Sequence, residues 1–312
     1  MNELRQTLRS LRRTPSFALI SIATLGLAIG AIASIFSVVD TVLLDPLPFT
    51  DGDRLVHIRA SAPGSDWEGE FGYSAEFWAQ FREESELLES LGTSNRFTST
   101  LRTADRTERI WMSAPTPATF KTLGVGPAFG RLPTVEDGEE VAVLSHGLWS
   151  TWFGADPDIV GKTYSISGSD RTVIGVMPEG FFFPTDQIQL WFPNIIETAE
   201  IQPGRFGMDL VGRLAPGVTY GALQTELKLL GDRVPERFGG SPNYERFVGQ
   251  IQPVVGSLEA SLLGDISRPL FILLAAMGIV LLIACANVAN LFMVRAERRQ
   301  GDQAIRSALG AG

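Results

Sequence analysis

Two stretches without a charged residue, 14–39 and 269–294, stand at either end of a polar middle region. A transmembrane α-helix needs roughly 20 apolar residues to cross about 30 Å of hydrocarbon at about 1.5 Å per residue. Both stretches are long enough, even for a tilted helix. The pattern therefore predicts one membrane span over 16–44 and a second over 269–294, with one large region between them.

The middle region, 45–268, alternates short apolar strands with amphipathic helices. Predicted strands cover 55–59, 98–101, 108–112, 141–144, 162–166, 172–176, 209–214 and 247–254. One predicted helix begins at Ser74 and carries Phe77, Trp78, Phe81, Leu87 and Leu88 on its apolar side; others cover 117–123, 146–153, 220–238 and 257–268. This order predicts an α+β membrane protein whose mixed α/β domain has two β–α–β arms, about 45–115 and 205–268, around an insert at about 116–204. The last helix is expected to continue without a break into the second span.

The charge distribution sets the expected orientation. Residues 1–13 hold four arginines against Glu3, and residues 295–312 hold four arginines against two acidic residues. The whole chain has a net charge of −9, so its acidic charge lies between the spans. Basic flanks of membrane spans stay in the cytoplasm. We therefore expect a cytoplasmic N-terminus over 1–15, a cytoplasmic segment over 295–312 and an exported middle region.

The first apolar stretch has a second interpretation. Arg12-Arg13-Thr14-Pro15-Ser16-Phe17 resembles a twin-arginine export signal, and Ala31-Ile32-Ala33 has the form of a cleavage site. The apolar run continues past this point to Leu44 and is longer than the core of a signal peptide. A retained membrane helix is therefore favoured over a cleaved leader.

Small and polar residues inside the two spans predict helix–helix contacts. Gly26, Gly30 and Ser34 repeat at four-residue steps, a spacing that lets helix backbones approach closely in lipid. The alternative is that membrane helices are simply rich in small residues. Asn287 and Asn290 in the second span suggest further helix partners. The alternative interpretation of these two asparagines is that they contact water near Arg295. If both faces are packing faces, the membrane domain contains further helices.

Composition excludes several classes of function. The acidity of the middle region argues against nucleic acid as a partner and against a basic face for anionic lipid. The single cysteine, Cys285, lies in the second predicted span, so the exported region has no disulfide. The two histidines, His57 and His146, are far apart in sequence and no HExxH pair exists, so no metal site is expected.

Two local patterns resemble catalytic motifs but receive a structural interpretation. Gly161-Lys162-Thr163 resembles the end of a phosphate-binding loop, yet Asp156 stands where that loop needs its first glycine. A carboxylate at that position would repel a nucleotide. Ser145 is adjacent to His146 and is expected to cap the helix that follows it rather than to act as a nucleophile. We expect no catalytic residue and no cofactor, and we do not expect the chain to be an enzyme.

Several segments along the chain resemble one known family. They are Leu8–Pro15, Ile35–Val39, Leu43–Pro48, Val143–Trp149, Phe153-Gly154, Gly161–Thr163 and Val173–Pro178. The most specific pair is Leu281–Leu291 followed by Ala304–Ala311. On these segments the chain resembles the permease subunits of the MacB/FtsX-like class of ABC systems, most closely the ADOP-type permeases. Because that family continues into two more spans per half, the chain resembles its N-terminal portion.

The resemblance implies a fold, a location and partners. The family has a periplasmic core of porter-like β–α–β units with an inserted smaller α/β subdomain, carried by the bacterial inner membrane. It implies a cytoplasmic ABC ATPase, the remaining permease helices or a second permease half, and membrane lipid as partners. It also implies that the helix at about Glu297–Leu309 docks on the ATPase. The residues that would make this coupling contact are Arg298, Asp302, Ile305, Arg306 and Leu309, with Arg306 foremost.

Two points limit this transfer of residue roles. The family usually has a glutamate and an aliphatic residue where Asp302 and Gln303 stand, so the polarity of the docking face differs. Arg306 also has an alternative interpretation, as a basic flank without a partner.

Three functions are therefore compared. The first is a permease subunit that couples a separate cytoplasmic ATPase to motion of a periplasmic domain, in efflux or mechanotransmission. The second is a two-span receptor or assembly protein whose exported domain binds a partner without ATPase coupling. The third is a membrane-anchored exported enzyme that depends on His146. The sequence favours the first.

Overall fold

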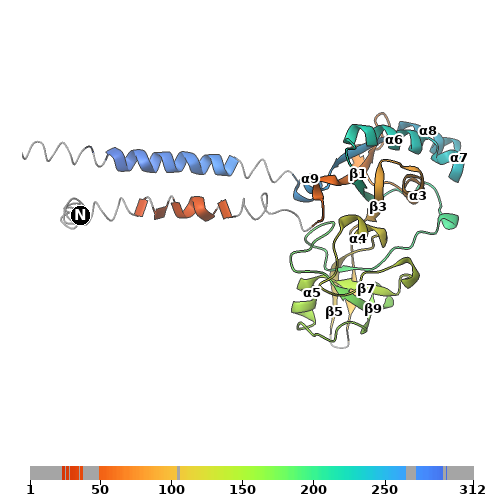
Figure 1. Cartoon of the computed structure of the whole chain (residues 1–312), viewed down its shortest axis with the longest axis horizontal. Coiled ribbons are helices and arrows are strands. Elements are labelled where there is room, and N and C mark those ends of the chain that lie inside the picture. Colours follow the sequence, from red (N-terminus) through yellow and green to blue (C-terminus); the bar gives the residue numbers. More distant parts are fainter. Residues whose placement is uncertain are drawn as a thin grey trace, which may run out of the picture. The chain divides into compact units, whose positions relative to one another are not determined.

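The computed structural model describes residues 23, 24, 26, 27, 29–34, 36, 37, 49–103, 106–264, 272–290 and 293. The chain divides into two compact units, one over 46–262 and the other from the two terminal parts, 1–45 and 263–312 (Figure 1). The first of these units contains all the strands described below and is called the exported-region unit.

A split β–α–β sheet forms one half of this unit. Its strands are β1 (Leu55–Ser61), β2 (Glu70–Phe71), β3 (Leu88–Ser94), β11 (Asp209–Leu214) and β12 (Gln252–Ser257). The strand order is β12-β1-β11-β3, every neighbouring pair is antiparallel, and β2 pairs with the end of β1. This is the ferredoxin-like order of two interleaved β–α–β elements. Strand β11 lies between β1 and β3 of the first element, and β1 lies between β11 and β12 of the second.

Four helices cover one face of that sheet. They are α3 (Ala75–Glu84), α6 (Tyr220–Asp232), α7 (Val234–Phe238) and α8 (Pro242–Gln250), which gather in one half of Figure 1. Because side chains alternate along a strand, Val56 and Ile58 of β1 join Phe77 and Leu227 in the core beneath these helices. Leu55, His57 and Arg59 consequently point to the opposite face.

The insert is a closed β-barrel. Its strands are β4 (Phe97–Arg102), β5 (Thr107–Ser113), β7 (Val141–Leu144), β8 (Thr163–Ile166), β9 (Ser169–Val176) and β10 (Leu190–Trp191). The order β9-β7-β10-β5-β4-β8 closes on itself, because β8 also pairs with β9. The pairs β7/β9 and β5/β10 are parallel and the others antiparallel. A core that includes Leu101, Met112, Ile166 and Val173 fills the barrel.

Shorter elements complete the unit. The short helices are α4 (Ala118–Leu123), α5 (His146–Trp152) and α9 (Leu258–Leu263), and β6 (Phe129–Gly130) pairs on the outside with β9. Single turns of 3₁₀ helix cover η2 (Gly52–Arg54), η3 (Val135–Asp137) and η4 (Thr198–Glu200). In Figure 1, α4 lies between the sheet and the barrel.

A third apolar core joins the sheet to the barrel, and we call it the shared core. Leu55 and Val211 contribute from the sheet, and Val143, Ile174 and Trp191 from the barrel. The remaining members are Phe49, Phe120, Leu123, Val141, Met177, Phe181, Phe183, Ile188 and Leu258. The barrel is therefore packed onto the face of the sheet that the helices leave free.

Most of the predicted elements are confirmed, and several differ. The strand expected over 247–254 is wrong: residues 242–250 form α8, and the strand begins at Gln252. Ser241 accepts a hydrogen bond from Tyr244 N at 3.3 Å and Pro242 follows it, a strong helix start. The helix expected over 220–238 divides after Asp232, next to Pro235. Leu87 and Leu88 do not continue the helix from Ser74, since α3 ends at Glu84 and Leu88 opens β3.

The extent of the insert and the form of the last helix also differ from expectation. Strands β4 and β5 belong to the barrel, so the inserted structure begins at Phe97 rather than at about 116. The helix expected over 257–268 ends at Leu263, because Gly264 has φ +60°, in the left-handed region where helices terminate. The α-helix thus ends before Gly264, and residues 265–271, which were expected to continue it, lie outside the described residues.

The membrane spans are described only in part. Within the described residues, one helix is long and apolar enough to cross a membrane, Ile272–Asn290, with 19 residues and a mean hydropathy of 2.6. It lies inside the span predicted over 269–294. The span predicted over 16–44 falls largely outside the described residues, and those of its positions between 23 and 37 that are described are helical.

Candidate functional site

The segment that leads into the exported-region unit and the helix that leads out of it are anchored in the same place. Phe49 is 8% exposed and its ring meets that of Phe181 edge-on at 6.3 Å. Leu258, the first residue of α9, is 2% exposed in the same shared core, and Leu262 packs against it. Force applied to either segment would therefore reach side chains that the sheet and the barrel have in common.

Arg213 holds the entering segment in place. It lies on β11 and is 8% exposed. Its Nη2 donates to the carbonyl of Thr50 at 2.6 Å and its Nη1 to that of Asp51 at 3.2 Å. Nε and Nη2 both donate to the carbonyl of Thr122 in α4, at 3.1 and 2.8 Å. One guanidinium thus ties three separate segments of the chain together.

A close contact beside Arg213 reinforces this tie. Thr50 Oγ1 donates to the carbonyl of Gly124 at 2.8 Å, at the point where α4 ends. Gly124 has φ +69°, and a Cβ there would lie 2.8 Å from the Cβ of Thr50. Glycine is therefore required here both by the backbone conformation and by the closeness of the entering segment.

A polar cluster lies beneath the exit helix α9. Ser261 of α9 is hydrogen bonded to Nδ1 of His57 at 2.9 Å. Asp209 Oδ1 lies 3.9 Å from His57 Nε2 and 3.1 Å from Arg59 Nε. A pocket of about 540 Å³ opens here between β1, β11, α9 and the loop at Phe183–Thr185. The free face of the sheet is therefore apolar near Leu55 and polar near Arg59, with α9 crossing both parts.

The Ser261, His57 and Asp209 cluster differs from a hydrolytic triad. In a triad the carboxylate orients the imidazole by a direct hydrogen bond. The separation of 3.9 Å between Asp209 and His57 is beyond hydrogen-bond length, and Arg59 engages the same carboxylate oxygen. The geometry suits attachment of α9 to the sheet rather than nucleophile activation.

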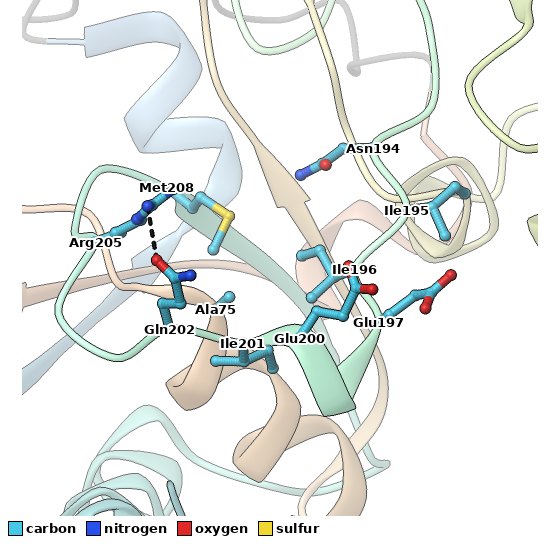
Figure 2. A pocket seen from close by; sticks show the side chains of 10 residues that line it. All are labelled: Ala75, Asn194, Ile195, Ile196, Glu197, Glu200, Ile201, Gln202, Arg205 and Met208. Carbon is cyan, nitrogen blue, oxygen red and sulfur yellow. Dashed lines mark hydrogen bonds between the residues drawn. The ribbon is translucent and has the colours of Figure 1, made fainter. Parts of the chain in front are cut away.

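A second pocket, of about 370 Å³, lies along the segment that returns from the barrel to the sheet. Figure 2 shows Ile195, Ile196, Ile201 and Met208 around it, with Glu197 and Glu200 at its margin. Arg205 donates to Gln202 Oε1 at 2.7 Å on the other side (Figure 2). Most of its lining comes from residues 194–208, so the pocket depends on the path of this returning segment.

A buried carboxylate fixes that path. Glu76, in the first turn of α3, is fully buried, and its Oε1 accepts from Gly204 N at 2.8 Å and from Tyr244 Oη at 2.7 Å. Ser74 Oγ donates to the same oxygen at 2.5 Å. Burial, together with the hydrogen bond to Glu76, raises the pKa of the Tyr244 hydroxyl. Glu76 therefore joins α3, the returning segment and α8.

The structure describes only some of the site residues predicted from sequence. Gly26, Gly30 and Ser34 are exposed, and no described atom lies within 4 Å of a Cβ built on either glycine. Ser34 Oγ donates to the carbonyl of Gly30 at 2.9 Å, within its own helix. Asn287 and Asn290 are exposed on the helix Ile272–Asn290. The predicted packing faces are thus uncovered within the described part of the chain and remain predictions.

The five predicted ATPase-coupling positions all lie outside the described residues. They are Arg298, Asp302, Ile305, Arg306 and Leu309. Their role therefore stays a prediction. The anchoring residues Arg213 and His57, in contrast, were not singled out for such a role from sequence. Their significance depends on contacts with residues more than 80 positions away, for which a single sequence gives no local signal.

The structure confirms the cap expected at Ser145 and shows an ion pair in the second motif-like segment. Ser145 Oγ accepts from Leu148 N at 3.0 Å and caps α5. Asp156 forms an ion pair with Lys162, which lowers the pKa of the Asp156 carboxyl, so the lysine is engaged within the loop itself. Among the described residues, no three acidic, histidine or cysteine side chains are grouped so as to hold a metal ion.

Comparison with solved structures finds several similar domains, the first of which supports the fold. A domain of a Porphyromonas gingivalis protein described as a permease aligns with a TM-score of 0.52 and 18% identity, over 68% of this chain and 92% of that domain. The periplasmic region of MacB from Actinobacillus actinomycetemcomitans gives 0.49 and 15%, over 67% and 91%. The extracellular domain of the ABC-type transporter YknZ from Gram-positive bacteria gives 0.45 and 14%, over 64% and 99%.

Comparison with sequence families identifies the chain more directly. No curated protein matches it. The profile of the family described as "MacB-like periplasmic core domain" matches residues 18–230, more than half of the chain. That range contains the whole barrel, the strands β1, β3 and β11 of the sheet, and Arg213. The chain therefore belongs to the family of proteins with a MacB-like periplasmic core domain, found in permeases of the MacB/FtsX-like ABC class.

Proposed function

We propose that the chain is the N-terminal portion of a permease subunit that couples a separate cytoplasmic ABC ATPase to motion of its periplasmic domain, in efflux or mechanotransmission. Under this proposal residues 45–268 lie in the periplasm of a bacterium, and both termini face the cytoplasm across the inner membrane. The spans over 16–44 and 269–294 pack through Gly26, Gly30 and Ser34 and through Asn287 and Asn290. Further permease helices and lipid surround them.

The observation that carries the proposal is the anchoring of both connecting segments in the shared core. Phe49 enters it directly after the first span in sequence, and Leu258 and Leu262 enter it before the second. A domain that only displays a binding surface can hang on loose linkers, which tolerate many sequences. Here the described ends of both connections, residues 49–50 and 258–262, are packed or hydrogen bonded. Such connections pass displacement into the interior, as mechanical coupling requires.

The cytoplasmic side of the proposal rests on family membership and on charge. The segment 295–312 carries four arginines on the side that the positive-inside rule assigns to the cytoplasm. Arg298, Asp302, Ile305, Arg306 and Leu309 follow a helical spacing and would meet the ATPase along one side of a helix. Arg306 would make the principal contact through its guanidinium, which pairs well with carboxylates.

The test is to purify the tagged chain from its native bacterium in mild detergent, identify any ABC ATPase that accompanies it and measure ATP hydrolysis. We expect one such ATPase in the wild-type complex and, for Arg306→Glu, a loss of at least about tenfold in its recovery, equivalent to about 1.4 kcal/mol of binding free energy. Arg12→Glu is the matched control, because it removes the same charge from a basic flank outside the proposed docking helix.

One result would contradict this function, and a second would contradict the docking role of Arg306. Recovery of the wild-type chain without an ABC ATPase would favour the two-span receptor or assembly protein. Equal loss of the ATPase from the Arg12→Glu and Arg306→Glu variants would show that membrane insertion, rather than docking, had been disturbed.

A further inference from the structure

We propose that Arg213 is the positioning residue through which displacement of the entering segment reaches both the sheet and α4. This inference rests on the proposed function, since it assigns a step within the coupling. Arg213 belongs to strand β11, and its side chain binds residues 50–51 and the C-terminal turn of α4. It therefore joins three segments that only the fold brings together.

The contacts of Arg213 differ from those of an ordinary surface arginine. All four of its hydrogen bonds go to backbone carbonyls, and three of its nitrogens take part. The side chain of Asp51 is 60% exposed and its carboxylate lies 4.0 Å from the guanidinium, so this ion pair contributes little. The guanidinium therefore holds the path of the backbone rather than a partner side chain.

The position of Arg213 gives it access to both halves of the unit. Its strand, β11, lies between β1 and β3, so a shift of β11 acts on the middle of the sheet. The Thr122 carbonyl belongs to α4, whose residues Phe120 and Leu123 pack in the shared core with Trp191 of the barrel. Movement of residues 50–51 would thus be passed to the sheet through β11 and towards the barrel through α4.

A second buried arginine provides a matched comparison. Arg171 on β9 is 5% exposed and, like Arg213, donates to backbone carbonyls, those of Glu139 and Ile166. Its guanidinium lies 3.9 Å from the ring centre of Phe192. These partners all belong to the barrel and its adjoining loop. Arg171 therefore resembles Arg213 in burial and chemistry, but among the described residues it joins no segment that adjoins a predicted span in sequence.

The test measures amide hydrogen exchange in the complete complex with its ATPase, with and without ATP. In the wild type, ATP is expected to change exchange by at least about threefold in peptides covering 49–58 and in those covering 118–126. In Arg213→Gln the change in 49–58 should persist. The change in 118–126 should be clearly reduced, because among the described residues the only hydrogen bond that then joins the two segments runs from Thr50 Oγ1 to the Gly124 carbonyl. Arg171→Gln should keep both changes. Arg213→Lys should be intermediate, because one ammonium cannot reach three carbonyls.

Each outcome decides the proposal. Arg213→Gln with both ATP-dependent changes intact would overturn it. If Arg213→Gln and Arg171→Gln reduced the change in 118–126 equally, the role of Arg213 would be only structural, which also overturns it. A wild-type complex without an ATP-dependent change anywhere in 49–262 would overturn the coupling function itself. Exchange of the barrel peptides 163–176 without ATP shows whether the Arg213 variants remain folded.

Discussion

At the scale of single residues, this chain buries several charged groups, each of which binds at least one backbone atom. Arg171, Arg213 and Glu76 each bind main-chain groups of segments that are distant in sequence. Removing such a group leaves buried carbonyl or amide groups without a partner, which costs about 1–3 kcal/mol for each group. Desolvation lowers the pKa of the Arg171 guanidinium, although it stays charged at neutral pH. These residues therefore define the paths of loops more than they add to the apolar cores.

The ion pair between Arg131 and Asp137 gives a prediction for acid stability. Arg131 donates to both carboxylate oxygens of Asp137, and Thr134 N donates at 2.8 Å. These contacts, that with Arg131 foremost, hold the pKa of Asp137 below its ordinary value. The ion pair then stabilises the folded state fully above the pKa of an aspartate in the unfolded chain, about 4. This stabilisation is lost as the pH falls through the lower pKa of Asp137 in the folded state. Asp137→Asn should lower the melting temperature at pH 7, with a difference that shrinks towards pH 2.

The measurement is thermal unfolding of wild type and variant in detergent between pH 7 and pH 2. Asp186→Asn is the control, since Asp186 is exposed and its side chain forms no hydrogen bond or ion pair with the other described residues. A difference between Asp137→Asn and wild type that stayed constant over the whole pH range would contradict the role given to the ion pair.

At the scale of elements, local signals explain what could be predicted. Strand β7 matches its expected bounds, because its sequence Val-Ala-Val-Leu is uniformly apolar. Strand β11 also matches, with Leu210, Val211 and Leu214 as its apolar positions. Strand β3 was missed, since its sequence Leu-Glu-Ser-Leu-Gly-Thr-Ser has no clear period, and the neighbour β11 that fixes it lies more than 100 residues away. Strand β10 has two residues and pairs on both sides, an arrangement visible only in the folded barrel.

Helix caps supply a prediction at this scale. Ser145 caps α5 and Ser241 caps α8, each by accepting a hydrogen bond from the third residue after it. Ser145→Ala and Ser241→Ala should each lower the free energy of unfolding by about 1 kcal/mol, while aspartate at either position should retain most of it. Ser150→Ala is the control, since that hydroxyl donates to Gly147 within α5 and caps nothing. Chemical denaturation of the detergent-solubilised chain measures the difference, and equal effects at all three serines would contradict the assignment of caps.

At the scale of the whole molecule, the exported-region unit depends on the shared core. The sheet and the barrel each have a core of their own, and the third core contains the residues that join them. Sequence patterns predicted two arms and an insert, because each has its own set of apolar elements. The same patterns could not predict that Phe49 and Leu258 both lie in the shared core. The two residues are 209 positions apart, and each is a single apolar residue next to a linker.

Leu258→Ala tests the weight of that joint core. Leu258 is 2% exposed, and truncation of a buried leucine costs about 2–5 kcal/mol, depending on how far the cavity collapses. We expect a loss in that range together with faster hydrogen exchange in α9. Leu229→Ala removes the same atoms from a side chain that is 64% exposed and should change stability by less than about 0.5 kcal/mol. Equal effects of the two substitutions would show that α9 is not anchored by Leu258.

The end of α9 before Gly264 bears on what kind of force the exit segment can carry. A glycine in the left-handed region changes its two dihedral angles at low cost, so the chain around it acts as a swivel. A swivel transmits tension along the chain but lets rotation about the helix axis dissipate. In the coupling that we propose, α9 would then receive tension along the chain more readily than rotation about its own axis.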